Sequence, residues 1–119
     1  MLPLHTSRDT LRERAFALHE AQQFEQAEPL YRHVLQLVPN DTEVGYALGV
    51  LLLQTQRYAD AALLLAAAAA HDDTAAAHCY LASAYAGLGK ADEARTHYER
   101  AARIDYLDSF LERASGAVS

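Results

Sequence analysis

Small residues recur along this chain at a nearly constant spacing, and this period constrains the fold more than any other feature. Ala15, Gly49 and Ala82 follow one another at intervals of 34 and 33 residues. A second set of alanines keeps the same spacing: Ala27, Ala61 and Ala94. A fixed period of this size is typical of helical repeat proteins, in which each repeat packs on its neighbours. We therefore predict an all-α fold of three antiparallel helix pairs.

Apolar residues at helical spacing, separated by short turns, place the helices of each pair. We expect helices over residues 8–21, 24–37, 42–54, 57–70, 75–88 and 91–104, a last short helix within 107–115, and a frayed tail over 115–119. Capping residues mark the boundaries, because their side chains satisfy free backbone N–H groups. The expected caps are Thr6 or Ser7, then Asp41, then Asp73 or Thr74, and Gly89 is expected to close the fifth helix.

Composition narrows the class of partner. The 119 residues form one domain, 1–119, with a net charge of −6 and a pI near 5.4. Nucleic acids and anionic membranes both require a basic surface, so we expect neither as a partner. The run over residues 59–70, apolar except for Asp60, is too short to span a bilayer, and the N-terminus lacks the features of a secretory signal. The chain is therefore predicted to be cytoplasmic, and its Ala- and Arg-rich composition favours a bacterial source.

Catalytic and metal-binding patterns are absent from the sequence. Cys79 is the single cysteine, so it can form no disulfide within the chain, and we interpret it as a half-buried structural thiol. The six histidines show no two-histidine pair one helical turn apart. No Gly-rich phosphate loop or nucleophile motif occurs. We expect no enzyme activity, no metal and no cofactor.

The repeated residues resemble the tetratricopeptide repeat (TPR) family, whose pattern has the same period. The repeats would be 8–41, 42–74 and 75–108, with a C-terminal cap at 107–115. Tyr31, Leu65 and Tyr98 stand at the family's Phe position, whereas its Trp position is not matched. The resemblance implies a right-handed superhelix. It also implies that Phe110 and Leu111, on a short final helix, cover the helix before them.

The resemblance further implies a peptide-binding groove lined by the first helix of each pair. Carried onto this chain, the groove residues are Arg12, Phe16, His19, Tyr46, Ala47, Val50, Leu53, Ala76, Cys79, Tyr80 and Ser83. One TPR subgroup holds a C-terminal carboxylate with Lys, Asn and Arg, and we expect that clamp to be absent here. An apolar, aromatic groove suits an apolar peptide or the apolar face of a helix. Phe16 and Val50 could equally fill space between helices.

The functional hypothesis is a protein-interaction module, such as a small bacterial chaperone or assembly factor. One alternative is a self-assembling structural protein, a homodimer included, that uses helix 59–70 or the C-terminal face. Leu63, Leu64, Ala66, Ala67 and Ala70 would then form an oligomer patch, although alanine also serves simply as a good helix former. A second alternative is a regulatory partner of a separate enzyme.

Overall fold

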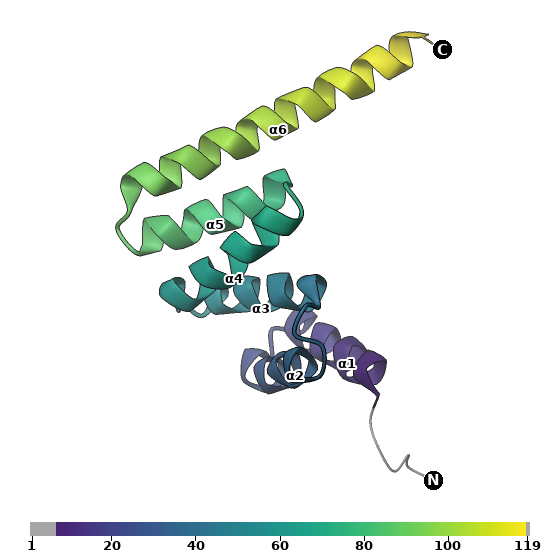
Figure 1. Cartoon of the computed structure of the whole chain (residues 1–119), viewed down its shortest axis with the longest axis vertical. Helices are drawn as coiled ribbons and strands as arrows, with labels where there is room; N and C mark the ends of the chain where they lie inside the picture. The colour runs from purple at the N-terminus through teal and green to yellow at the C-terminus, as the bar shows by residue number, and fades with distance from the viewer. Residues whose placement is uncertain (1–6, 119) are drawn as a thin grey trace.

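The computed structural model describes the backbone of residues 7–118 and the side-chain exposure of residues 7–116. Over this range the fold is all-α, with six helices: α1 (Arg8–Glu20), α2 (Phe24–Leu37), α3 (Thr42–Gln54), α4 (Tyr58–His71), α5 (Ala75–Gly87) and α6 (Ala91–Val118). The helices stack in chain order, with α1 and α2 at one end and α6 at the other (Figure 1). The predicted helical repeat fold is confirmed. Residues 1–6, which include the candidate cap Thr6, lie outside the described residues, as does Ser119.

The first helix of each pair begins at a capping side chain. The side-chain oxygens of Ser7, Asp41 and Thr74 each accept a hydrogen bond from the backbone N–H three residues further on. Such bonds satisfy one of the free N–H groups of the first turn. The three caps recur with the same period as the small residues. Thr74, not Asp73, is therefore the cap of α5.

The same helices also end alike. Gln22, Gln56 and Gly89 all have positive φ angles, of 62°, 63° and 77°. The N–H of the following residue bonds in each case to a carbonyl five positions earlier, as in a Schellman motif. The prediction for Gly89 is confirmed. The two glutamines adopt a left-handed conformation that favours glycine, and nothing in their side chains signals it.

Close helix approach explains the recurring small residues. Ala15, Gly49 and Ala82 are all buried, in α1, α3 and α5. A Cβ added to Gly49 would lie 2.9 Å from Leu65 Cγ, so α3 and α4 leave no room for a side chain there. Helix separation is set by the side chains at the crossing. The small residues therefore fix the spacing on which the groove depends.

The C-terminal helix differs from the expectation. The predicted separate short helix at 107–115 is wrong, because α6 runs unbroken for 28 residues, from Ala91 to Val118. Phe110 and Leu111 do not cover the preceding helix; they lie on its continuation and are exposed. The tail from 115 to 118 is helical, not frayed. Neither proline nor glycine interrupts residues 105–115, so no residue there ends the helix.

Candidate functional site: a groove across the first helices of the pairs

A cavity of about 680 Å³ opens across α1, α3 and α5. Its lining residues are Phe16, His19, Glu20, Gln22, Tyr31, Glu43, Tyr46, Ala47, Val50, Gln54 and Tyr80. Six of the groove residues chosen from the sequence are among them: Phe16, His19, Tyr46, Ala47, Val50 and Tyr80. The structure thus brings together residues separated by up to two repeats in the chain.

Aromatic side chains form much of the groove surface. The rings of Tyr46 and Tyr80 meet edge to face, with centroids 5.9 Å apart. Tyr80 is 38% exposed, whereas Tyr46 is half-buried and packs against the core. Burial, with Tyr80 and Cys79 nearby, raises the pKa of Tyr46, so its hydroxyl stays protonated at neutral pH. The pair offers a neutral aromatic surface on one side of the groove.

Phe16 and Val50 both line the groove and fill space between helices, the two roles considered from the sequence. Each is half-buried and packs against the core, and each also lines the cavity. The ring of Phe16 meets that of Tyr31 edge to face, at 5.6 Å between centroids. The groove floor is therefore continuous with the core, and its shape is fixed by core packing.

His19 is held in place by hydrogen bonds from both ring nitrogens. Its Nε2 lies 2.6 Å from Gln54 Oε1, and its Nδ1 lies 2.8 Å from the hydroxyl of Tyr31. The amide oxygen can only accept, so Nε2 donates, and Nδ1 of the neutral ring accepts the Tyr31 proton. Tyr31 is fully buried, which raises its pKa to about 12. His19 thus presents a fixed ring to the groove while its nitrogens are occupied.

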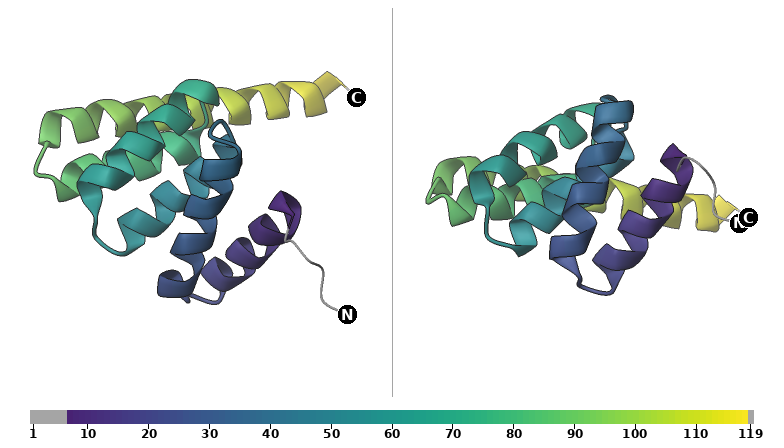
Figure 2. Two further views of the ribbon diagram at one scale, coloured as in Figure 1. Left: turned by 60° about the horizontal axis from the view of Figure 1, so that its bottom comes forward. Right: turned by 90° about the horizontal axis from the view of Figure 1, so that it is seen from below.

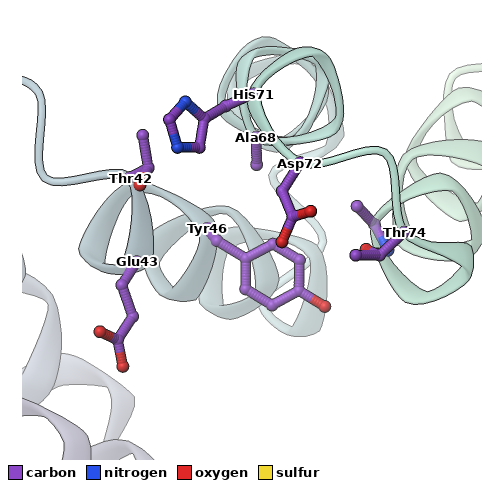
Figure 3. A pocket seen from close by; sticks show the side chains of 8 residues that line it. Thr42, Glu43, Tyr46, Ala68, His71, Asp72 and Thr74 are labelled. Atoms are coloured by element: carbon purple, nitrogen blue, oxygen red, sulfur yellow. The ribbon is translucent and has the colours of Figure 1, made fainter.

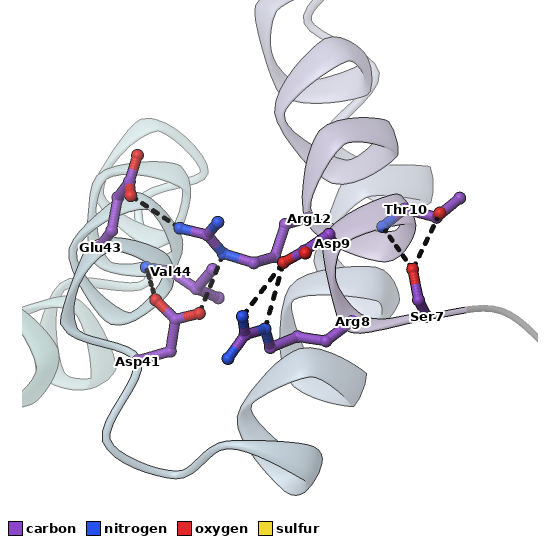
Figure 4. Close-up of polar contacts among 8 residues, drawn as sticks. All are labelled: Ser7, Arg8, Asp9, Thr10, Arg12, Asp41, Glu43 and Val44. Carbon is purple, nitrogen blue, oxygen red and sulfur yellow. Dashed lines mark hydrogen bonds and ion pairs between the residues drawn. The ribbon is translucent and has the colours of Figure 1, made fainter.

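Arg12 lies outside the cavity lining and is already neutralised. Its Nε is 2.9 Å from the carboxylate of Asp41, and one Nη is 2.6 Å from that of Glu43 (Figure 4). The guanidinium carbon also stands 5.7 Å from the centroid of the Phe16 ring. These contacts join α1 to the start of α3. Arg12 is therefore a structural link between repeats and not a free cation for a peptide carboxylate.

The remaining predicted groove residues do not line this cavity. Leu53 is half-buried against the core. Ser83 donates to the Cys79 carbonyl and lies 3.1 Å from the hydroxyl of Tyr98 on α6. Ala76 and Cys79 are exposed, so the expectation of a half-buried thiol is wrong. Within this cavity α5 contributes Tyr80 alone.

Sequence reasoning missed the polar edge of the groove. Gln54 follows Val50 by one helical turn, and Glu43 precedes Tyr46 by nearly one, so both share a face of α3 with predicted residues. That spacing could have identified both. Glu20 ends α1, and Gln22 lies in the left-handed turn that follows it. Spacing alone does not reveal that turn.

Comparison with known proteins identifies the family. Models of the tetratricopeptide repeat match residues 18–78 and 75–108. The chain belongs to the tetratricopeptide repeat family. No curated protein matches the sequence. The expected TPR resemblance is thereby confirmed.

Solved structures share the TPR fold. MamA from Desulfovibrio magneticus RS-1 is 26% identical with a TM-score of 0.81, over 83% of this chain and 56% of that one. MamA of MSR-1 is 22% identical with a TM-score of 0.79, over 86% and 59% of the two chains. YrrB, described as a TPR protein with an unusual peptide-binding site, is 21% identical with a TM-score of 0.79, over 95% and 59%. The chain thus spans less than two thirds of the length of each.

A second, smaller cavity of about 420 Å³ adjoins the TPR groove at Tyr46. It lies between the start of α3 and the turn that joins α4 to α5, and Figure 3 shows Tyr46, His71 and Asp72 around it. Glu43 lines both cavities. The groove surface therefore continues past Tyr46 into a more polar, acidic region.

The predicted oligomer patch on α4 reduces to one prominent side chain. Leu63 is 73% exposed. Leu64 and Ala66 are half-buried and pack against the core, while Ala67 and Ala70 are exposed but small. Isolated exposed leucines are common on monomeric proteins. Association through this patch stays a prediction.

A polar cluster joins α5 to α6. His78 is buried; its Nε2 lies 2.5 Å from Asp73 and its Nδ1 lies 2.9 Å from Nδ1 of His97. Arg100 also pairs with Asp73, and the rings of His97 and Tyr85 stack. The contact between two Nδ1 atoms requires one donor and one acceptor, so it cannot form when both rings are protonated.

This cluster predicts that acid destabilises the protein. Burial, with the charge of His78 nearby, lowers the pKa of His97 below its ordinary value of 6.5. Between that folded-state pKa and about 6.5, the unfolded chain therefore binds more protons than the folded chain. The free energy of unfolding should fall as the pH drops below about 6.5. Arg100, and then His78, lower the pKa of Asp73, so that carboxylate stays charged through this window.

Urea unfolding at neutral and mildly acidic pH measures the effect. Replacing His97 with glutamine should reduce the loss of stability on acidification, because the titrating group is gone. His33→Gln is the matched control, since His33 is exposed and forms no part of the cluster. An equal pH dependence in the two variants would contradict the role assigned to His97.

The described part of the chain contains neither a metal-binding cluster nor a membrane-spanning helix. No group of three or more His, Cys, Asp or Glu side chains is arranged to hold a metal ion among the described residues. No helix within residues 7–118 combines the length and apolarity needed to cross a membrane. The TPR groove, with its cavity of about 680 Å³, is therefore the candidate site.

Proposed function

We propose that this TPR protein is a non-enzymatic interaction module that binds an apolar segment of another protein in the groove across α1, α3 and α5. The observation that supports this most is the 680 Å³ cavity with Phe16, Tyr46, Val50 and Tyr80 on its surface. Aromatic side chains give large contact areas at low cost in conformational entropy, and such residues dominate binding energies. YrrB, which has this fold, is a TPR protein with a peptide-binding site.

The groove favours an apolar ligand over a carboxylate-terminated one. Its lining includes the carboxylates of Glu20 and Glu43, and Arg12, which contacts Glu43, is also paired with Asp41. A peptide carboxylate would meet like charge and no free guanidinium. We infer that an extended apolar peptide or the apolar face of a helix is the ligand. A small bacterial chaperone or assembly factor in the cytoplasm is the role that fits this ligand.

Alanine substitution at the tyrosine pair tests the proposal. A peptide is first selected from a random display library on the immobilised protein, and its dissociation constant is then measured by fluorescence anisotropy. Replacing Tyr46 and Tyr80 together with alanine should weaken binding about thirtyfold or more, as loss of a hot spot of about 2 kcal/mol does. Both side chains are partly exposed, so the helix content should be unchanged.

Leu63→Ala is the matched control. Leu63 is an exposed apolar residue on α4, away from the groove lining, so its loss should leave the dissociation constant unchanged. Unchanged peptide binding in a folded Tyr46 and Tyr80 double variant would overturn the groove as the binding site. Equal weakening by Leu63→Ala would also contradict it, because the exposed face of α4 would then take part.

A further inference from the structure

The C-terminal half of α6 projects beyond the rest of the fold (Figures 1 and 2). Every side chain described from 105 to 115 is exposed. The apolar residues among them include Leu107, Phe110 and Leu111, which are 49%, 52% and 63% exposed. Clustered exposed apolar side chains mark interaction surfaces. This segment is distinct from the groove, since α6 contributes no lining residue to it.

The spacing of the apolar residues is that of a coiled-coil seam. Ile104, Leu107, Leu111 and Ala114 follow one another at alternating steps of three and four along the helix. This alternation keeps the apolar side chains facing a single partner helix. Ile104 is half-buried and the other three are exposed, so the seam starts where α6 leaves the fold. The partner that this pattern selects is one parallel or antiparallel helix.

Charges beside the seam make the helix complementary to its own copy. Arg103 and Asp108 occupy the two positions that flank a coiled-coil seam, and neither forms an ion pair among the described residues. In a parallel pair in register, Arg103 of each copy faces Asp108 of the other, which gives two opposite-charge contacts. An antiparallel pair brings the two Asp108 side chains together instead. The charges therefore favour the parallel arrangement.

Other occupants fit this surface less well. The projecting segment carries Asp105, Asp108 and Glu112 against one arginine, Arg113. An anionic membrane would repel it. The groove of another copy has only acidic charges in its lining and offers no cation to Asp108, whereas a second α6 in parallel register offers Arg103.

We propose that two copies of this chain pair in parallel through the C-terminal half of α6, with Ile104, Leu107, Leu111 and Ala114 as the seam. The fold holds the start of α6 in place, so pairing does not have to nucleate that helix. The seam shares no residue with the groove on α1, α3 and α5. The dimer therefore presents two grooves, and a partner with two apolar segments would bind with higher avidity.

Sedimentation velocity over a wide range of protein concentration tests the pairing, and it needs no peptide ligand. The unaltered chain should pass from monomer to dimer as concentration rises. Leu111→Glu should leave a folded monomer, because Leu111 is exposed in the single chain. Arg103→Glu or Asp108→Arg alone should each raise the dissociation constant roughly fivefold or more, since two pairs become repulsive.

The double charge exchange gives the decisive result. Combining Arg103→Glu with Asp108→Arg should restore the original dissociation constant, because the opposite-charge contacts return. Glu112→Arg, which places a similar charge change on the outer side of the helix, is the matched control and should have little effect. A monomer at every concentration, a dimer that withstands Leu111→Glu, or a double variant that fails to restore pairing would each overturn the proposal. None of these outcomes bears on peptide binding in the groove.

Discussion

Replacing Tyr31 with alanine is expected to lower the free energy of unfolding by about 3–5 kcal/mol. Tyr31 is fully buried and is among the largest side chains in the core. Its ring contacts those of Phe16 and His19, so its loss leaves a cavity between α1 and α2 and beneath the groove. A domain of this size is stable by only about 5–15 kcal/mol. Urea denaturation followed by circular dichroism measures the change.

Tyr31→Phe separates packing from hydrogen bonding. This variant keeps the ring and removes only the hydroxyl that contacts Nδ1 of His19. It should cost about 1 kcal/mol, the typical net value of one hydrogen bond. If phenylalanine proved as destabilising as alanine, the hydroxyl and not the packing of the ring would dominate at this position, contrary to the expectation.

Replacing Gly49 with leucine is expected to cost roughly 3 kcal/mol or more, by forcing α3 and α4 apart. Even the Cβ of the new side chain would lie 2.9 Å from Cγ of Leu65 and 3.3 Å from Cβ of Leu64. Leu65 is fully buried and cannot move aside without disturbing the core. The melting temperature and the urea midpoint should both fall.

Gly45→Leu is the matched control, since it introduces the same side chain one turn earlier on α3. No atom lies within 4 Å of a Cβ at Gly45. Leucine is also a better helix former than glycine by up to about 1 kcal/mol, so stability should hold or rise. Similar losses at the two positions would show that Gly49 has no special role in helix spacing.

The helices and their period were predictable from the sequence, because the same local chemistry recurs in each repeat. Capping residues, turn lengths and small residues at the crossings all act over short stretches of chain, so the sequence displays them directly. Ser7, Asp41 and Thr74 are examples. The separate C-terminal helix was wrong for the opposite reason. The expectation placed a break before residue 107, whereas residues 105–115 contain no proline or glycine that would end α6.

The groove was only partly predictable. The TPR resemblance implied which residues share the groove face, and Phe16, Tyr46, Val50 and Tyr80 do line the cavity. Spacing does not show which polar groups pair across helices. Arg12 is neutralised by carboxylates at the start of α3, and Ser83 is engaged by Tyr98 of α6. Such tertiary pairing decides which side chains remain available to a ligand.

Nuclear magnetic resonance of the isotope-labelled protein, titrated with the selected peptide, tests the proposed binding site most directly. Chemical-shift changes are expected at Phe16, Tyr46, Val50, Gln54 and Tyr80, on α1, α3 and α5. Signals from Leu63 on α4 and from Leu107 and Leu111 on α6 should stay in place. Shifts confined to α4 or α6, with the groove residues unmoved, would contradict the groove as the binding site.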